Sequence, residues 1–549
     1  MKRIIIMVLI LLIFIVTYGF FPLYSSPSVS TPPVKQDISL LVHKIVDSAN
    51  NGRLFDAPFV IGETDIAAVE NTWATPSSIN NTSVGIYASY NAYSVELGYY
   101  RNSPLFDLRS YNKSITTVTM NDVIQVMGQP SSISYFNASD VHQQIFIYSL
   151  NNDNQLRWVM DVPTTQAANP KIDHISIYNR PIAKTSIPAK IYKMALDEKI
   201  GQMFMVGING TVPGADAKAM INQEHVGGFI LYGKNITSPN QTVALTNELK
   251  TLNSKAHNPQ PLFLSLDQEG GKVDKMPLPI LKMPSNATVG MIDNPGYSYR
   301  IGQILGSECA NFGFNLDYAP VIDVITDPHK CAIGDRSFGS NPSIVSQLGL
   351  STMKGIQSKK VISVMKHFPG YGSVAIDVHI DLATVDYGLE TFQKIDWVPY
   401  KNAIQNGADI VMVTHLLVPK LDDTYPSSMS QKIITGQLRN NLGFQGVIIT
   451  DDMTMGAIEK NYDIQTATLK AIEAGADIVL VAFHQDQQES AMAAIKAAVK
   501  EGTISENQID DSVYRIIQLK QKYNLSGQLI KNPDIEKLNT NIQRVVSSQ

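Results

Sequence analysis

Cysteine, clustered positive charge and several common catalytic motifs are scarce or absent in this 549-residue chain, and each gap excludes a class of protein. Two cysteines, Cys309 and Cys331, are too few for a disulfide framework or a cysteine-based metal cluster, although a single bond between them stays open. A net charge of −5 without a Lys/Arg-rich stripe argues against nucleic acid as a partner. The composition, 44% hydrophobic and 17% charged, is typical of a globular protein, and the length predicts more than one domain.

Near the N-terminus the chain carries one long hydrophobic run. Lys2 and Arg3 precede residues 4–24, which are uncharged and contain an apolar stretch that approaches the roughly 20 residues of a bilayer span. Positive charge before such a run predicts that the rest of the chain faces outward, with residues 1–24 as a membrane anchor or a cleaved signal peptide. Residues 25–39 are rich in Ser and Pro and are expected to form an extended linker. We therefore expect an extracytoplasmic protein, membrane-anchored, or secreted if the segment is cleaved.

An internal repeat occupies residues 40–180. The segments "VENTWATPSSI" (69–79) and "VIQVMGQPSSI" (123–133) both end a helical pattern at a Pro-Ser-Ser-Ile turn, and alternating Tyr- and Val-rich stretches follow each of them. This pattern predicts a small α+β domain built from two helix-plus-hairpin units. The region resembles a small extracytoplasmic domain of unknown function from Gram-positive bacteria, and we assign it no chemistry.

After a hinge at residues 180–190, residues 190–525 contain eight short apolar runs separated by helical segments. The runs cover residues 203–208, 227–233, 262–271, 314–324, 361–368, 409–417, 446–452 and 477–484. Buried parallel strands connected by crossover helices have this appearance, so we predict an α/β fold of the (β/α)8 TIM-barrel type. Polar residues at the run ends would meet at one mouth of the barrel, where such folds place their active sites: Asp267, Lys366, His367, His415, Asp451 and Asp452. Residues 526–549 are predicted to form a polar tail.

Several chemistries are compatible with such a group of carboxylates, a lysine and histidines. No histidine pair has the spacing of H-E-x-x-H, and Lys366 would place a cation beside His367, so we expect no metal. The run ends also lack the G-x-S-x-G elbow of a serine hydrolase and a Gly-rich phosphate loop. Acid–base cleavage of a sugar acetal fits better: Asp451 is placed to act near the anomeric carbon, and an Asp377–His379 pair can supply the proton.

Six motifs carry a resemblance to a known family. They read "SLDQEGG" (265–271), "NLDYAPVIDV" (315–324), "DRSFG" (335–339), "KHFPGYG" (366–372), "DVH" (377–379) and "GVIITDDMTMGAI" (446–458). Together they resemble family 3 of the glycoside hydrolases, in particular its bacterial β-N-acetylglucosaminidases. The resemblance implies Asp451 as nucleophile and His379 as acid/base with Asp377 as its partner, and no cofactor. It further implies that sugar hydroxyls are held by Asp267, Lys275, Arg336, Lys366 and His367.

The chain departs from the family pattern at several positions near these motifs. The usual His after "KHFPG" is Tyr371, the following Asp is Ser373, and a common Ser between Asp377 and His379 is Val378. Two expected arginines after "DQEGG" are lysines, Lys272 and Lys275, and a lysine lacks the bidentate grip of an arginine. These changes bear on the preferred sugar and on how strictly an N-acetyl group is required.

The resulting prediction is a retaining exo-β-N-acetylhexosaminidase that releases N-acetylglucosamine from cell-wall glycan fragments. Two alternatives remain at this point: a phosphorylase or another β-glycosidase on the same fold, and an inactive membrane-tethered scaffold that binds glycans. We expect Asp452 to be structural, whereas Asp323 and His415 suit either the barrel rim or direct sugar contact. The sequence does not indicate the oligomeric state.

Overall fold

The computed structural model describes residues 38–138, 141–151, 153–327 and 331–548. The predicted anchor or signal peptide (1–24) and nearly all of the predicted linker (25–39) lie outside the described residues. The described residues pack as two units, residues 38–58 with 109–176 and residues 59–108 with 177–548. None of the helices in the described ranges combines the length and the hydrophobicity that a bilayer crossing requires. Cys309 and Cys331 are both free thiols.

The two predicted N-terminal repeats are present, and each contains one helix followed by four strands. Helix α1 (Ile38–Asn50) precedes them. The first repeat consists of α2 (Ile66–Trp73), β1 (Ser78–Thr82), β2 (Gly85–Tyr90), β3 (Val95–Tyr99) and β4 (Asp107–Ser110), with strand order β1-β2-β3-β4. The second consists of α3 (Met120–Met127), β5 (Ser132–Ala138), β6 (Val141–Ser149), β7 (Asn154–Asp161) and β8 (Ile172–Asn179), with strand order β8-β7-β6-β5. Each repeat therefore contains four strands, whereas the sequence predicted a single hairpin of two.

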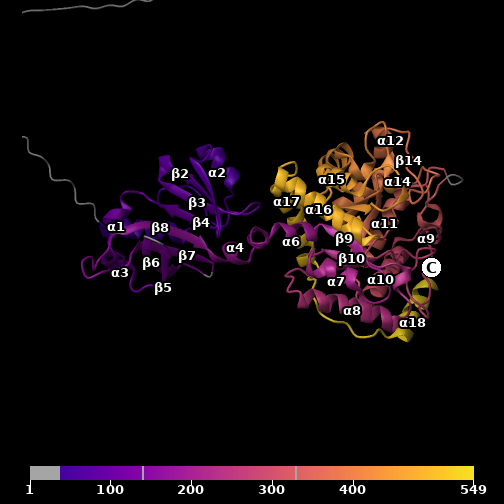
Figure 1. Ribbon diagram of the computed structural model, residues 1–549, viewed down its shortest axis with the longest axis horizontal. Coiled ribbons are helices and arrows are strands. Elements are labelled where there is room, and N and C mark those ends of the chain that lie inside the picture. Colours follow the sequence, from indigo (N-terminus) through magenta and orange to yellow (C-terminus); the bar gives the residue numbers. More distant parts are fainter. Residues whose placement is uncertain (1–37, 139–140, 152, 328–330, 549) are drawn as a thin grey trace, which may run out of the picture. The chain divides into compact units, whose positions relative to one another are not determined.

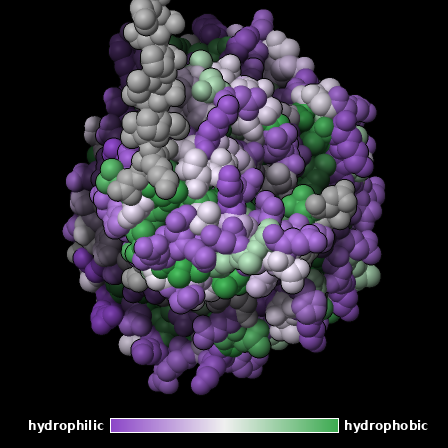
Figure 2. All heavy atoms as spheres, turned by 90° about the vertical axis from the view of Figure 1, so that its left-hand side faces the viewer, coloured by the Kyte–Doolittle hydropathy of each residue, from purple (hydrophilic) through white to green (hydrophobic). Residues whose placement is uncertain are grey.

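Two of the extra strands, β1 and β5, escaped the sequence pattern because they bury few side chains. Strand β1 reads "SINNT" and is exposed along its whole length, so it shows no apolar alternation. On the described part of β5, Ile133, Tyr135 and Phe136 are exposed as well, whereas the central tyrosines Tyr87 and Tyr148 are buried. Figure 2 shows one face of the molecule, on which apolar residues lie at the surface between hydrophilic ones. The tyrosines of the inner strands serve sheet packing.

Eight parallel strands close into a barrel and follow one another in chain order. They are β9 (Phe204–Gly207), β10 (Gly228–Ile230), β11 (Phe263–Leu266), β12 (Leu316–Asp317), β13 (Ile362–Phe368), β15 (Ile410–Val413), β17 (Val447–Asp452) and β18 (Ile478–Val481), and β18 pairs with β9. Each predicted apolar run contains one of these strands, so the barrel prediction is confirmed. All strand residues are buried except the half-buried Asp451, because helices cover the outside and side chains fill the inside.

Helices surround the barrel strands (Figure 1). They are α6 (Leu196–Gln202), α7 (Ala215–Asn222), α8 (Pro239–Lys255), α9 (Asn286–Ile292), α10 (Pro295–Asn311), α11 (Pro342–Gln357), α12 (Leu389–Lys394), α13 (Trp397–Gln405), α14 (Gly456–Glu459), α15 (Ile464–Ala474), α16 (Gln485–Glu501) and α17 (Glu506–Lys522), with a π-helix at Lys432–Asn441 and a short strand pair, β14 (Ala383–Thr384) and β16 (Leu416–Leu417). Three of these helices begin at Ser238, Asn294 or Asn341, each followed by proline. The capping side chain accepts a backbone N–H, and proline suits the first helical position.

Two connecting segments are more ordered than the sequence suggested. The hinge at residues 180–190 forms two short helices, α4 (Arg180–Thr185) and α5 (Ile187–Tyr192), each with a proline in its first turn. The predicted polar tail contains helix α18 (Ile535–Val546), which contacts α10. Residues 538, 542 and 545 of α18 are apolar and buried, so a narrow stripe at helical spacing holds an otherwise polar segment on the barrel.

Candidate active site

A cavity of about 360 Å³ opens where the C-terminal ends of the barrel strands meet. Strands β13 and β17 and the residue that follows β11 bring side chains to it, and a short 3-10 helix and the loop after β13 contribute two more. Six of the predicted site residues line this cavity: Asp267, Arg336, Lys366, His367, His379 and Asp451. The barrel thus gathers residues that are up to 184 positions apart in the chain, as 451 − 267 gives.

A buried cluster of two cations and two carboxylates forms one wall of the cavity. The Nζ of Lys366 lies 2.6 Å from Asp267 Oδ1 and 2.7 Å from Glu269 Oε1. Arg336 donates two hydrogen bonds to Glu269, of 2.9 and 2.7 Å. Burial raises the pKa of Glu269, but the charges of Lys366 and Arg336 outweigh it and hold the pKa well below its usual range. Glu269 therefore stays ionised and fixes both cations, while the partly exposed Asp267 remains accessible to a sugar hydroxyl.

His367 is held in one tautomer by its two neighbours. Its Nδ1 lies 2.7 Å from Asp323 Oδ2, and because an ionised carboxylate only accepts, Nδ1 carries the proton. Its Nε2 lies 3.3 Å from the Arg336 guanidinium, which only donates, so Nε2 is the acceptor. Asp323 does not line the cavity; of the two roles that the sequence allowed it, the structure assigns the supporting one.

Asp451 ends the seventh strand with its carboxylate held at both oxygens. The Thr414 hydroxyl donates to Oδ2 and the backbone N–H of Asp452 donates to Oδ1, both at 3.0 Å. Burial raises the pKa of Asp451, but His415, two further imidazoles and the Asp452 N–H outweigh it and leave the pKa below its ordinary value. The group is therefore an oriented carboxylate at neutral pH, which is the form that a nucleophile requires.

Asp377 and His379 form the predicted pair on the loop that follows β13. The Nδ1 of His379 lies 2.7 Å from Asp377 Oδ1, and the same oxygen accepts the backbone N–H of His379 at 2.9 Å. Burial raises the pKa of Asp377, but these hydrogen bonds outweigh it and lower the pKa. With Nδ1 donating to the carboxylate, Nε2 is left for proton exchange, and the imidazole is 66% exposed.

Backbone contacts attach this loop to helix α14, which follows the strand that carries Asp451. The carbonyls of Val378 and His379 accept the N–H groups of Ala457 and Gly456, at 3.1 and 3.2 Å. A Cβ atom at Gly456 would lie 2.7 Å from the His379 oxygen and 2.6 Å from that of Ile380. The glycine of the "TMGAI" motif is therefore required for close approach of the loop.

Lys275 was predicted to bind substrate, and it does not line the cavity. Gly270 and Gly271, both at positive φ, turn the chain after β11, and the backbone N–H of Lys275 then donates to Gln268 Oε1 at 2.8 Å. The turn chemistry that takes Lys275 away was visible in the sequence as "EGG". Glu269 was not predicted as a site residue. A single acidic residue in a turn does not indicate which cations it will pair with, and here those cations are Lys366 and Arg336.

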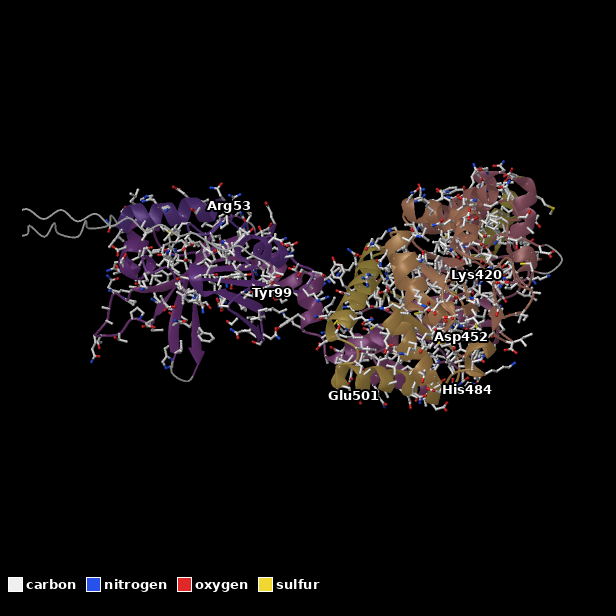
Figure 3. The ribbon with its side chains drawn as sticks, turned by 90° about the horizontal axis from the view of Figure 1, so that it is seen from above. Arg53, Tyr99, Lys420, Asp452, His484 and Glu501 are labelled. Atoms are coloured by element: carbon white, nitrogen blue, oxygen red, sulfur yellow. The ribbon has the colours of Figure 1, made fainter. Side chains whose placement is uncertain are left out.

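Two strand-end residues have supporting roles. Asp452 accepts N–H groups of Thr454 and Ala482, each at 3.0 Å, and so organises the strand ends, but it also lines the cavity. The buried His415 lies with Nε2 2.9 Å from the Asp452 carbonyl and does not line the cavity. In the view of Figure 3, Asp452 lies over the middle of the barrel domain and His484 nearer its margin. Within the described ranges, no cluster of three or more His, Cys, Asp or Glu side chains is arranged to hold a metal ion.

An ionised carboxylate and the histidine of an Asp–His pair line one cavity, and another wall of that cavity offers charged groups that can bind sugar hydroxyls. This combination on a (β/α)8 barrel defines a glycosidase-type site. Residues 195–519 match the family model described as the glycosyl hydrolase family 3 N terminal domain. That match covers more than half of the chain, so the chain belongs to glycosyl hydrolase family 3. Residues 42–178 match a domain of unknown function, DUF4309.

Relatives and solved structures agree with this assignment. The chain is 30% identical over 325 residues to beta-hexosaminidase A of Pseudoalteromonas piscicida, covering 55% of this chain and 54% of that protein. It is 30% identical over 326 residues to a beta-hexosaminidase of Nitrosomonas eutropha, covering 58% and 92%. A family 3 beta-N-acetylglucosaminidase structure from Paenibacillus sp. superimposes with a TM-score of 0.61 at 35% identity, covering 64% of this chain and 68% of that one. The chain thus spans about half of the first relative and nearly all of the second.

Proposed function

We propose that the protein is a retaining exo-β-N-acetylhexosaminidase that removes terminal N-acetylglucosamine from glycans. The observation that carries the proposal is that Asp451 and His379 line one cavity, with Asp451 ionised and with the exposed His379 bonded to Asp377. The names of the relatives support the sugar: beta-hexosaminidases and a beta-N-acetylglucosaminidase recur among them.

The proposed reaction has two steps. Asp451 attacks the anomeric carbon while His379 Nε2 protonates the leaving oxygen, which gives a covalent glycosyl-aspartate. His379, now neutral, then removes a proton from water, and the water displaces Asp451 with overall retention. Asp377 stabilises the imidazolium that the second step forms, and no cofactor enters either step.

The remaining cavity walls suit a sugar ring. Lys366, Arg336 and Asp267 line the cavity and supply donors and acceptors for hydroxyl groups, while Glu269 behind them holds the two cations in place. Tyr232 and Phe483 also line the cavity and are stacked, with ring centroids 5.1 Å apart and ring planes at 25°. They give an apolar surface for the CH faces of a sugar or for an acetyl methyl.

Turnover of 4-nitrophenyl N-acetyl-β-D-glucosaminide by the purified full-length chain tests the proposal, with the matching β-glucoside alongside. Asp451→Ala should lower kcat about a thousandfold or more, and His379→Ala about a hundredfold or more. Asp386→Ala and His43→Ala, both at exposed positions away from the cavity, are the matched controls and should behave as wild type. No turnover of the N-acetyl substrate by a folded wild type, or equal turnover in Asp451→Ala, would refute the proposal. Phosphate-dependent formation of a sugar phosphate would instead identify a phosphorylase.

We also propose that the enzyme works outside the cytoplasm on cell-wall glycan fragments, tethered through residues 1–24 or released by their cleavage. The uncharged apolar run behind Lys2 and Arg3 supports this location. Cell fractionation with N-terminal sequencing of the mature chain tests it. Recovery of the intact chain in the cytoplasmic fraction would contradict the proposed location.

A further inference from the structure

Tyr371 is a buried side chain at the base of the loop that carries His379. It is 3% exposed, and its hydroxyl donates to the carbonyl of Ile376 at 2.9 Å and accepts the backbone N–H of Val378 at 2.8 Å. The two bonded peptide groups flank Asp377 and end directly before His379. One phenol oxygen therefore closes the 376–378 turn, which contains Asp377 and leads directly into His379.

The other end of Tyr371 is tied to the sugar-binding side of the cavity. Its backbone N–H donates to Asp323 Oδ1 at 2.8 Å, and Oδ2 of the same carboxylate holds His367. The rings of His367 and Tyr371 pack edge to face, with centroids 5.8 Å apart. Tyr371 thus connects a rigid strand end to the exposed loop.

The hydroxyl also completes the set of hydrogen bonds around Val378. The Val378 carbonyl is held by Ala457, and its N–H is held by Tyr371. Val378 is 1% exposed, so its N–H has no access to bulk water if the phenol oxygen is removed. Both Tyr371 and Val378 are positions at which this chain departs from the family motif, and the structure joins the two in one hydrogen bond.

We propose that Tyr371 is a positioning residue for proton transfer: its hydroxyl holds the 376–378 turn so that His379 faces the leaving oxygen above Asp451. The inference rests on the proposed function, because it assigns to Tyr371 the alignment of the proposed acid/base. Tyr371 does not line the cavity, so it acts through the loop and without touching the sugar.

The test compares two aryl N-acetyl-β-glucosaminides in the Tyr371→Phe variant, which loses only the oxygen. The phenyl glycoside has a poor leaving group that needs a proton, whereas the 2,4-dinitrophenyl glycoside departs without one. We expect kcat/KM to fall about tenfold for the phenyl glycoside and less than about twofold for the dinitrophenyl glycoside. A variant that is merely less folded would lower both values equally.

Two further measurements connect the effect to His379. In the His379→Ala background, Tyr371→Phe should cause no additional fall, because the two residues then share one function. Hydrogen exchange should accelerate in the peptide that contains Val378. As a matched control, Tyr148→Phe removes another buried hydroxyl that donates to a carbonyl, that of Gly128 at 2.8 Å in the second repeat, and should leave both glycosides unaffected.

The outcomes separate this inference from the proposed function. If wild type cleaves neither glycoside, the proposed function fails and the role of Tyr371 falls with it. If wild type cleaves both and Tyr371→Phe leaves the ratio of the two kcat/KM values unchanged, or adds its full effect to His379→Ala, the inference is overturned while the proposed function stands.

Discussion

Replacing Glu269 by Gln removes one negative charge from the buried cluster at the barrel mouth and keeps the shape of the side chain. In the wild type, the negative charges of Glu269 and Asp267 compensate the positive charges of Lys366 and Arg336. In Glu269→Gln, two buried cations would face a single carboxylate, and the new amide would bring N–H donors toward groups that are themselves donors. We expect the folded state to bear most of this cost, because in the unfolded chain water solvates all four groups.

The size of the effect follows from burial. Glu269 is 2% exposed and pairs with two cations at 2.7 Å. Removing one partner of a buried ion pair costs about 3–5 kcal/mol. Asp267 continues to compensate the charge of Lys366 in Glu269→Gln. We therefore expect the substitution to lower the free energy of unfolding by about 3 kcal/mol at neutral pH, at the lower end of that range.

The pH dependence gives a second, independent signature. The pKa of Glu269 is lowered in the folded state, so its stabilising contribution is complete above the unfolded value of about 4.3 and is lost as the pH falls below it. The stability difference between wild type and Glu269→Gln should therefore shrink by up to about 1.4 kcal/mol for each pH unit below about 4. Urea unfolding followed by circular dichroism at about pH 5.5, 4.0 and 3.0 measures this difference.

Glu390→Gln is the matched control, because Glu390 makes a surface pair with Lys394 in which both side chains are at least 70% exposed. Such pairs contribute about 0–1 kcal/mol and should show little pH dependence. If Glu269→Gln is as stable as Glu390→Gln, or if its stability deficit stays constant from pH 5.5 to 3.0, the reasoning about the buried cluster is wrong.

Three further substitutions test the site. Gly456→Ala should push the loop away, since its Cβ would lie 2.7 Å from the His379 carbonyl, and should lower kcat/KM for an N-acetylglucosaminide about tenfold with faster hydrogen exchange in residues 376–381. Asp323→Asn should weaken control of the His367 tautomer and raise KM about tenfold or more with little change in kcat, as steady-state kinetics would show. Asp377→Asn should lower kcat about tenfold or more and affect poor leaving groups more than activated ones.

Controls for these substitutions lie in the same chain. Gly527→Ala places a Cβ in open space and should leave both kinetics and hydrogen exchange unchanged. Asp386→Asn alters an exposed carboxylate and should leave KM and kcat unchanged. Wild-type kinetics in Gly456→Ala would mean that the loop is not held by the close contact. A KM unchanged in Asp323→Asn, or equal losses for all leaving groups in Asp377→Asn, would contradict the roles assigned to those carboxylates.

The barrel could be predicted from the sequence because strands covered on both faces are continuous apolar runs. All eight runs became strands, and the topology of a parallel barrel then brings their polar ends to one mouth. For that reason Asp267, Lys366, His367 and Asp451 could be placed together before any coordinates. Strand β1 could not be predicted from the sequence because it buries no side chain. Helix α18 could not be predicted either, because it buries only a narrow apolar stripe.

Pairings within the site could not be predicted in the same way. A sequence states that Glu269, Lys275 and Arg336 carry charge, but it does not state which charges meet. The Gly270–Gly271 turn sends Lys275 away from the cavity and leaves Glu269 between two cations. From the sequence, Tyr371 is only a position at which the usual histidine is missing. Its role becomes visible in the structure, where its hydroxyl bonds to the backbone of Ile376 and Val378.

The sequence by itself determined the kinds of chemistry available to this protein: a barrel scaffold, a carboxylate at the end of the seventh strand, and an Asp-x-His pair close enough in the chain to bond locally. The tertiary structure decided which of these groups act on one another. Hydrophobic burial is non-directional and can be read as pattern, whereas hydrogen bonds and ion pairs depend on distance and angle between residues far apart in the chain, and only the folded backbone sets those.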